Sequence, residues 1–365
     1  MISPIPKMEA RKKLSQLLYI RFEWRFNMRS NMKWLFVCCL LTIVVATPLA
    51  ATALDDSQQP GSVLVFPVFE RGVVTTADQG VLPITSFEIS VACPKGSICT
   101  DGQDVDIRAH WVCSNGGVCA ERDFILDTTV NGTILFNPGS GGTIPPPGCR
   151  EGYLIVWVAD ESNTAIKFDG LIGDAVLRES SGAATAYNAI PIQAATALAT
   201  GAPTDVNHNG ALDFNGKEYQ TVTGKIYGSV RYDVISAAGF DQVETSLILL
   251  TLDTLSNRFN YPVFVDVNFY NESEALNSNS TAFFCWEEQS LSALGLDSSF
   301  GIKGLVESTR AVKVPIFGIS DKAGPVTLLG LVLTREFDPV TSGLLRHYAY
   351  ELKNDGTPRV TAFVP

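Results

Sequence analysis

Two stretches, Ser246-Leu-Ile-Leu-Leu-Thr-Leu252 and Tyr153-Leu-Ile-Val-Trp-Val158, are almost continuously apolar. Short apolar runs of this kind are typical of β-strands covered on both faces, because a buried helix would need a longer run. Elsewhere apolar and polar residues alternate, as in Phe87–Cys93 and Val105–Trp111. Alternation with a period of two indicates a strand with one buried face. We therefore expect the chain to fold mainly as β-strands.

Further strand-like segments, separated by Gly, Pro, Asn and Asp, recur along the chain. They are 62–69, 225–232, 263–270, 281–287, 311–319, 326–334 and 344–352. Helical periodicity is scarce, and short helices are expected only at Ile192–Thr200 and Gln289–Leu296. This pattern predicts an all-β fold, an antiparallel β-sandwich of jelly-roll or Ig-like type with few short helices. The chain is long enough to form one large sandwich or two packed sandwiches.

The composition excludes several classes of protein. The 365 residues are 46% hydrophobic and 18% charged, which is too apolar for a disordered chain. Lys and Arg number 27 against 38 Asp and Glu, so the net charge is −11, and no local basic stripe stands out. A polyanion would be repelled by such a surface. We therefore expect no nucleic-acid partner.

Residues 1–53 have the features of a secretory leader. Lys33 precedes the apolar run Trp34–Val45, and Ala51-Thr-Ala53 offers an Ala-x-Ala cleavage site, so cleavage is expected after Ala53. The alternative is an uncleaved anchor helix, which Thr47-Pro48 disfavours by interrupting the run. Cleavage removes eight of the 27 basic and two of the 38 acidic residues, leaving 312 residues with a net charge of −17. We expect a periplasmic or extracellular protein without a membrane span after signal removal.

The Gly- and Pro-rich stretch Asn137–Gly148 is the best candidate for a domain boundary. It would divide the chain into an N-terminal β region, 54–148, and a C-terminal β region, 149–365. The alternative is a single domain that contains both regions.

Six cysteines remain after the leader is removed: Cys93, Cys99, Cys113, Cys119, Cys149 and Cys285. An even number in an exported chain predicts disulfides, although the sequence leaves their pairing open. The identical spacing within Cys93–Cys99 and Cys113–Cys119 favours two local bridges, with Cys149–Cys285 as the long-range bond. The alternative is a zinc site from the first four cysteines. It is disfavoured because five residues separate each pair, whereas zinc ligands are usually about two to four apart.

The segment Asp205-Val-Asn-His-Asn-Gly-Ala-Leu-Asp213 resembles the calcium loop of EF-hands and dockerin-like modules. Oxygen-bearing side chains occupy loop positions 1, 3, 5 and 9, and the glycine at position 6 permits a sharp turn. A hard cation needs several oxygens that converge on one point. The resemblance implies five ligands: Asp205, Asn207, Asn209, Ala211 through its carbonyl, and Asp213.

The resemblance fails at the end of the loop. Position 12 is Gly216, where the pattern has a bidentate Glu, and Glu218 would serve only in a wider loop. The following residues read as strands, so we expect a calcium loop on a β scaffold, with modest affinity and with His208 facing solvent. The alternative is an Asn- and Gly-rich turn that holds no ion.

No catalytic motif is present. The three histidines, His110, His208 and His347, lie outside any Gly-x-Ser-x-Gly or His-Glu-x-x-His pattern. Strand-borne carboxylates for glycoside hydrolysis need no local motif, and the candidates beside aromatic residues are Asp160, Glu161, Asp266, Glu287 and Glu288.

We therefore expect a secreted, calcium-stabilised, disulfide-bonded and non-catalytic structural or ligand-binding module. Its expected partner is a carbohydrate or a cell-surface protein. The alternative is a secreted carbohydrate-active hydrolase that uses strand-borne carboxylates.

Overall fold

The computed structural model describes residues 59–72, 84–115, 118–139, 142–178, 182–231, 242–252, 262–296, 303–313, 324–338 and 344–354. The chain divides into two units, Met1–Ala50 and Ala51–Pro365, and every described residue belongs to the second. The predicted leader and its cleavage site lie outside the described residues. Within the described ranges, no helix has the length and apolar character needed to span a membrane.

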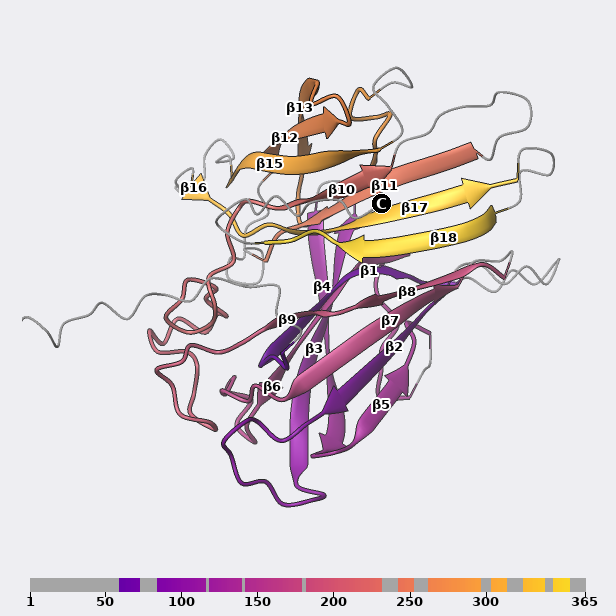
Figure 1. The fold of residues 1–365 in the computed structure, drawn as a ribbon. Helices are drawn as coiled ribbons and strands as arrows, with labels where there is room; N and C mark the ends of the chain where they lie inside the picture. The colour runs from indigo at the N-terminus through magenta and orange to yellow at the C-terminus, as the bar shows by residue number, and fades with distance from the viewer. Residues whose placement is uncertain are drawn as a thin grey trace, which may run out of the picture. The chain divides into compact units, whose positions relative to one another are not determined.

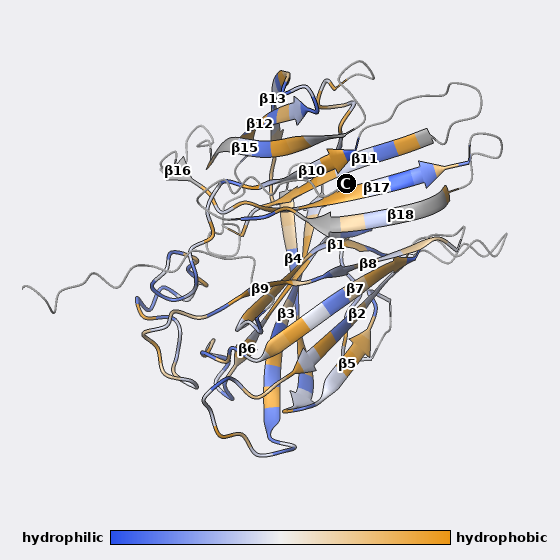
Figure 2. Cartoon of the chain, in the orientation of Figure 1, coloured by the Kyte–Doolittle hydropathy of each residue, from blue (hydrophilic) through white to orange (hydrophobic). Residues whose placement is uncertain are grey.

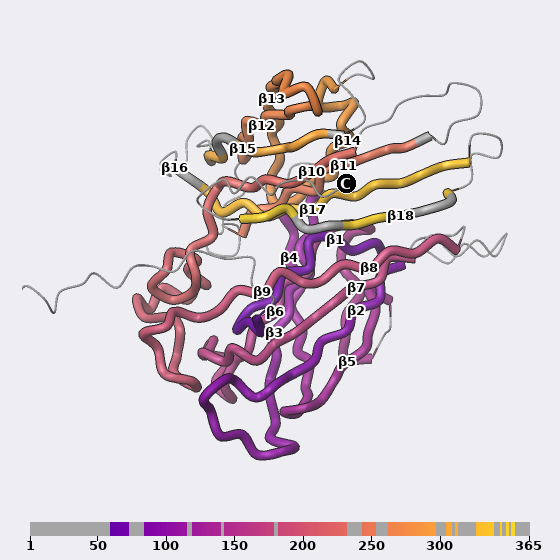
Figure 3. Tube along the Cα trace, viewed as in Figure 1, coloured from indigo at the N-terminus to yellow at the C-terminus, as the bar shows by residue number. Residues whose placement is uncertain are grey.

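The described residues form antiparallel β-strands and no helix (Figure 1). This confirms the expected all-β, antiparallel class. The strands lie in four small sheets, an arrangement that is not clearly a β-sandwich. Figure 3 follows the chain from β1 in indigo to β18 in yellow.

The first two sheets come from the N-terminal part of the unit. Sheet 1 has the order β4-β3-β6-β1-β9, with β4 Val118–Thr129, β3 Asp104–Asn115, β6 Glu151–Ala159, β1 Val63–Glu70 and β9 Ile190–Ile192. Sheet 2 has the order β5-β2-β7-β8, with β5 Thr133–Phe136, β2 Ile84–Val91, β7 Leu171–Arg178 and β8 Ala184–Asn188.

The other two sheets come from the C-terminal part. Sheet 3 has the order β10-β15-β12-β13, with β10 Tyr227–Arg231, β15 Lys303–Lys313, β12 Val263–Asn271 and β13 Leu276–Phe283, and β16 Gly324–Pro325 also pairs with β15. Sheet 4 has the order β14-β11-β17-β18, with β14 Trp286–Ser290, β11 Gln242–Leu250, β17 Leu329–Phe337 and β18 Leu344–Glu351.

The prediction of two short helices is wrong. Ile192 pairs with Val63 at the edge of sheet 1, and turns follow it. Gln289 pairs with Leu247 in sheet 4, after which the chain makes turns that end near Gly295, whose φ is 75°. Both segments are too short to form a stable helix alone, so the strand pairing of their first residues decides their structure.

The expectation that 246–252 and 153–158 are covered on both faces is confirmed. In β11, Leu247 and Leu249 belong to one hydrophobic core, whereas Ile248 and Leu250 belong to another. The partner strand β17 divides its side chains between the same two cores. In Figure 2, β17 is orange along its first part and blue toward its C-terminal end. Both faces of sheet 4 are therefore apolar along these two strands.

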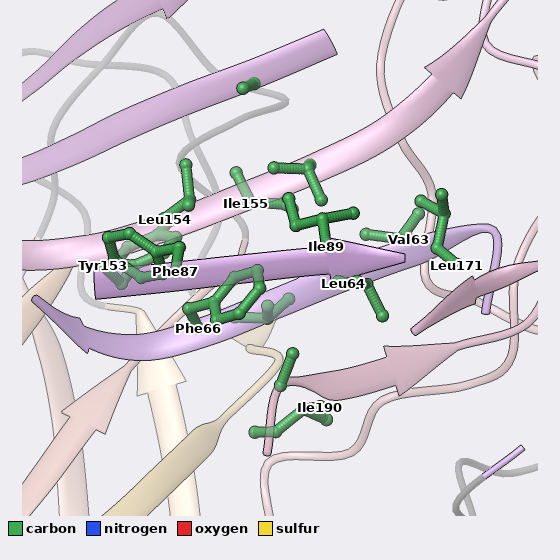
Figure 4. Packing of buried hydrophobic residues seen from close by; sticks show 14 of the residues in the cluster. Val63, Leu64, Phe66, Phe87, Ile89, Tyr153, Leu154, Ile155, Leu171 and Ile190 are labelled. Atoms are coloured by element: carbon green, nitrogen blue, oxygen red, sulfur yellow. The ribbon is translucent and has the colours of Figure 1, made fainter. Parts of the chain in front are cut away.

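The larger core contains side chains from sheets 1 and 2. Phe66 of β1 meets Phe87 of β2 edge to face, with ring centroids 5.0 Å apart, and Trp111 of β3 stacks on Phe124 of β4 at 5.0 Å. Figure 4 shows Leu64, Phe66 and Phe87 among these side chains. Because these residues come from strands far apart in the sequence, the core forms only when the sheets have paired.

The proposed boundary after Gly148 falls between strands that pair with each other. Strand β6 follows it, yet pairs with β1 and β3, which precede it. The Pro-rich segment itself contacts sheet 1, since the indole N–H of Trp111 donates to the carbonyl of Pro145 at 2.9 Å. The regions 54–148 and 149–365 therefore share a sheet.

The six cysteines from Cys93 to Cys285 all form disulfides, which excludes the alternative of a zinc site. The bridge Cys93–Cys99 is as predicted, whereas the other two bonds are Cys113–Cys149 and Cys119–Cys285. The predicted bridge between Cys113 and Cys119 is wrong because of the β3–β4 register. Cys113 lies opposite Ala120, so the side chains of the two cysteines point to opposite faces of the hairpin.

The long-range bridge should contribute most to stability. Replacing both Cys119 and Cys285 by Ala frees a loop with a sequence separation of 166, and replacing Cys93 and Cys99 frees one of only 6. In the chain-entropy model these losses are about 5 and about 2 kcal/mol, respectively. Urea denaturation of the two double variants measures the difference, and equal losses would contradict this prediction.

Candidate functional site

The predicted calcium loop lies in the long connection between β9 and β10, and its ends are fixed in the core. Thr204 and Tyr219 are fully buried, and their hydroxyl oxygens are 2.8 Å apart. The N–H of Thr204 donates to the carbonyl of Ala165, and Tyr219 forms a β-bridge with Ala194. The exposed residues between Thr204 and Tyr219 are therefore held on a rigid base.

The first part of the loop is organised by its own side chains. Asp205 accepts hydrogen bonds from the N–H groups of Asn209 and Gly210, at 3.0 and 2.9 Å. Asn207 Oδ1 accepts from Asn209 N, and Asn209 Oδ1 accepts from the N–H of Ala211. Positive φ angles at His208 (56°) and Gly210 (75°) give the loop its sharp turn. His208 is exposed, as expected.

The side chains of two predicted ligands, Asn207 and Asn209, meet that of a third, Asp213. Its Oδ2 atom lies 2.5 Å from Asn207 Nδ2 and 3.2 Å from Asn209 Nδ2. The Oδ1 atoms of Asn207 and Asn209 accept backbone hydrogen bonds, so the amide nitrogens of these two side chains face Asp213. The structure therefore brings Asp205, Asn207, Asn209 and Asp213 into one small loop.

The side chain of Glu218 holds the backbone of the loop through hydrogen bonds. Its carboxylate is buried, with only 1% of the residue exposed. Oε1 accepts hydrogen bonds from the N–H groups of Val206 and Asn207, and Oε2 accepts from that of Asp213, at 2.9 to 3.3 Å. Burial raises the pKa of the Glu218 carboxyl, and these backbone donors oppose the rise. Sequence reasoning considered Glu218 as a ligand, but its hydrogen bonds give it a supporting role.

The donor set of the loop suits a hard cation. Carboxylate, amide and backbone carbonyl oxygens are the ligands that Ca²⁺ takes, and Gly216 at position 12 adds no side chain. Within the described ranges, no three His, Cys, Asp or Glu side chains are grouped as metal ligands. A cation here would therefore depend on the two Asn side chains and on the carbonyl of Ala211 as well as on Asp205 and Asp213.

Replacing Glu218 by Gln should destabilise the protein whether or not calcium is present. The amide offers one acceptor oxygen in place of two, so at least one partly buried backbone N–H loses its partner, which costs about 1 kcal/mol. Thermal melts in EDTA and in calcium measure this loss. A loss seen only in calcium would instead make Glu218 a ligand.

A cavity of about 590 Å³ lies beside the base of this loop. Its polar lining includes Asp104 and Asp106 of β3 and Asp160 and Glu161 after β6, and its apolar lining includes Val158, Ile166 and Phe168. Ile166 forms a β-bridge with Pro203, two residues before the loop begins. The wall of the cavity and the loop are thus joined through a short backbone contact.

A second group of titratable side chains lies on the exposed face of β3 and β4. His110 Nε2 is 3.3 Å from Asp123 Oδ1, its Nδ1 is 3.9 Å from Glu121 Oε2, and its ring packs edge to face on Trp157. Burial lowers the pKa of His110. The negative charge of Asp123 raises this pKa, and the positive charge of Arg108 lowers it further. Burial and the charge of Asp123 raise the pKa of Glu121. The two carboxylates approach different ring nitrogens, so they do not surround a single point. No sequence motif marks this group.

His110 should make stability depend on pH. Because its pKa is lower in the folded state than the ordinary value of 6.5, the unfolded state binds more protons between these two values. The free energy of unfolding should therefore fall as the pH decreases through this window. Relative to the variant His110→Gln, the wild-type protein should lose up to about 1.4 kcal/mol per pH unit. Urea denaturation between pH 5 and 8 tests this, and parallel profiles would contradict it.

The five carboxylates proposed for a hydrolase lie in different parts of the fold. Asp266 accepts a hydrogen bond from Ser280 in sheet 3, and Glu288 pairs with Arg335 in sheet 4. Glu287 accepts a hydrogen bond from Gln289. Asp160 accepts hydrogen bonds from the backbone N–H groups of Ser162 and Thr164. Of the five candidates, only Asp160 and Glu161 line the cavity described above.

Comparison with known proteins does not define a family. No family model matches the sequence, and no curated protein matches it. Solved structures with similarity include a "putative secreted protein" of Parabacteroides distasonis, at 9% identity over 84% of this chain and 93% of that chain, with a TM-score of 0.18. A chemokine-binding protein encoded by rodent gammaherpesvirus Peru is 9% identical over 83% and 87% of the chains, with a TM-score of 0.16. Similarity at this level establishes neither a shared fold nor a shared function.

Proposed function

We propose that this protein is a calcium-stabilised, non-catalytic binding or structural module of the cell envelope or the extracellular space. The observation that carries the proposal is the loop at 205–213, in which the side chains of Asn207 and Asn209 meet that of Asp213 and the buried carboxylate of Glu218 holds the backbone. A preformed loop loses little conformational freedom when it binds an ion.

The charge of the loop and of the whole chain favours a divalent cation. The loop contributes two carboxylates, from Asp205 and Asp213, and the net charge of the chain is −11. Among the described residues, the side chain of Asp213 accepts hydrogen bonds from the neutral amides of Asn207 and Asn209, and no cationic side chain pairs with it. Calcium would supply the missing positive charge and would exchange these amide donors for oxygen ligands.

Calcium would also stiffen the cavity beside the loop. Thr204, which precedes the loop, is bonded to Ala165 by its N–H, and Ile166 lines the cavity. A bound ion would restrict the motion of this connection, and thereby the wall of the cavity. This link makes the cavity the proposed ligand site of the module.

The three disulfides support an oxidising location, because such bonds persist outside the cytosol. The periplasm and the extracellular space both meet this condition. We infer that the scaffold is a pair of β-sandwiches, sheets 1 and 2 around the larger core and sheets 3 and 4 around the smaller one. The two cores support this description, and sheet 4 joins them, because Ile248 and Leu250 of β11 pack in the larger core and Leu247 and Leu249 in the smaller one.

Calcium should raise the melting temperature of the wild-type protein, because an ion that binds only the folded state stabilises it. The gain is about 2.7 kcal/mol when free calcium is 100 times Kd. The variant Asp213→Asn should lose most of this shift while melting close to the wild type in EDTA, since Asn still accepts a hydrogen bond. Calorimetry in EDTA and in millimolar calcium measures both values.

Glu272→Gln provides the matched control, because it removes one exposed carboxylate in the turn between β12 and β13. This variant should keep the full calcium shift. The calcium site is refuted if the wild-type protein shows no shift, or if Asp213→Asn and Glu272→Gln respond alike.

A further inference from the structure

We propose that the outer edge of β4 is a docking site for an extended, lysine- or arginine-rich segment of a partner polypeptide, which adds to sheet 1 as a further strand. This surface is separate from the calcium loop, and the proposal does not depend on the ion.

Strand β4 is long, regular and at the edge of its sheet. It pairs with β3 from Val118 to Thr129 without a shift in register. Sheet 1 ends at this strand. Within the described ranges, no backbone hydrogen bond outside the β3–β4 ladder involves residues 119–128. An edge of this kind presents a row of N–H and C=O groups to solvent, and these are the groups with which an added strand pairs.

The side chains of β4 alternate between the core and the solvent. Phe124 and Leu126 are buried, whereas Glu121, Asp123 and Asp127 are exposed on the opposite face. Alternate side chains of an added strand would lie beside these carboxylates, at the spacing of about 5 Å between neighbouring strands. Basic side chains would therefore meet opposite charges at three of four alternate positions, and the exposed Ile125 occupies the fourth.

The neighbouring strand extends the negative charge. On the same face, β3 carries Asp104 and Asp106, and Asp106 lies directly opposite Asp127. Arg108 and His110 are the basic residues of β3 on this face, and burial lowers the pKa of His110, which favours its neutral form. On this face the two strands thus carry five carboxylates and one permanent cation, Arg108, whereas Arg122 lies on the other face of β4.

The same charges argue against a second copy of this chain as the occupant. Two β4 edges in contact would place carboxylates beside carboxylates, and like charges opposite each other destabilise a strand pair. Charged side chains along an edge are a common means by which proteins avoid self-association. A basic strand escapes this penalty, so the edge discriminates between partners by charge.

The test uses the mature protein and a ten-residue peptide with blocked ends, in which Lys and Val alternate. Fluorescence anisotropy of the labelled peptide measures affinity, and amide hydrogen exchange locates the contact. We expect saturable binding that weakens with salt and protects residues 119–128. The edge strand β13, whose segment Leu276–Phe283 carries no charge, should remain unprotected. No binding, or protection of β13 instead of β4, would overturn the proposal.

Two control peptides separate strand addition from simple charge attraction. In one, Glu replaces every Lys, and this peptide should not bind. In the other, alternate amides are N-methylated on the edge that would face β4, which keeps the charges but removes the N–H donors. This peptide should bind at least about tenfold more weakly. Equal binding of either control would overturn the proposal.

The matched variants remove two exposed carboxylates each. Glu121→Gln with Asp127→Asn should weaken binding of the Lys peptide at least about tenfold. Glu272→Gln with Glu274→Gln, in the exposed turn before β13, should leave it unchanged. If the first double variant does not fold, Asp127→Asn alone should still weaken binding. Equal effects of both double variants, or a wild-type dimer that protects β4, would refute the docking site.

Discussion

The structure depends on a central pair of strands, β11 and β17, which are buried on both faces. Leu247 and Leu249 of β11 contribute to one core, and Ile248 and Leu250 to the other. The backbone groups of such strands cannot reach water, so they must pair fully along the ladder, as the unbroken register from Gln242 to Leu250 shows. Both hydrophobic cores therefore rely on one hydrogen-bonded ladder.

Three specific contacts join this pair of strands and its neighbours to sheet 1. The indole N–H of Trp286 donates to the backbone carbonyl of Pro67 at 2.8 Å, and the hydroxyl of Tyr153 donates to the backbone carbonyl of Thr251 at 3.1 Å. The disulfide Cys119–Cys285 adds a covalent link. The carbonyl of Pro67 lies where the β1–β6 register shifts, so the irregularity of β1 coincides with this contact.

The candidate calcium loop shows how far local sequence predicts a site. The spacing from Asp205 to Asp213 locates a sharply turned loop whose side chains hydrogen-bond to one another and to its backbone. The role of Glu218 was not evident from this spacing, because it depends on burial and on three backbone donors from the other side of the loop. The group around His110 had no signal at all, since its members come from three strands.

The sequence by itself determined the β class, the main strands and the participation of the cysteines in disulfides. These properties depend on residue type and on a period of two along a single segment, so they are local. The tertiary structure alone decided that the strands form four sheets. It also decided that Cys285 bonds Cys119, whereas the sequence had favoured a bond between Cys285 and Cys149. It also left the acidic strand β4 at an edge. Strand-pairing and disulfide partners depend on strand register and on burial shared between segments that are distant in the sequence, and no local sequence pattern specifies these.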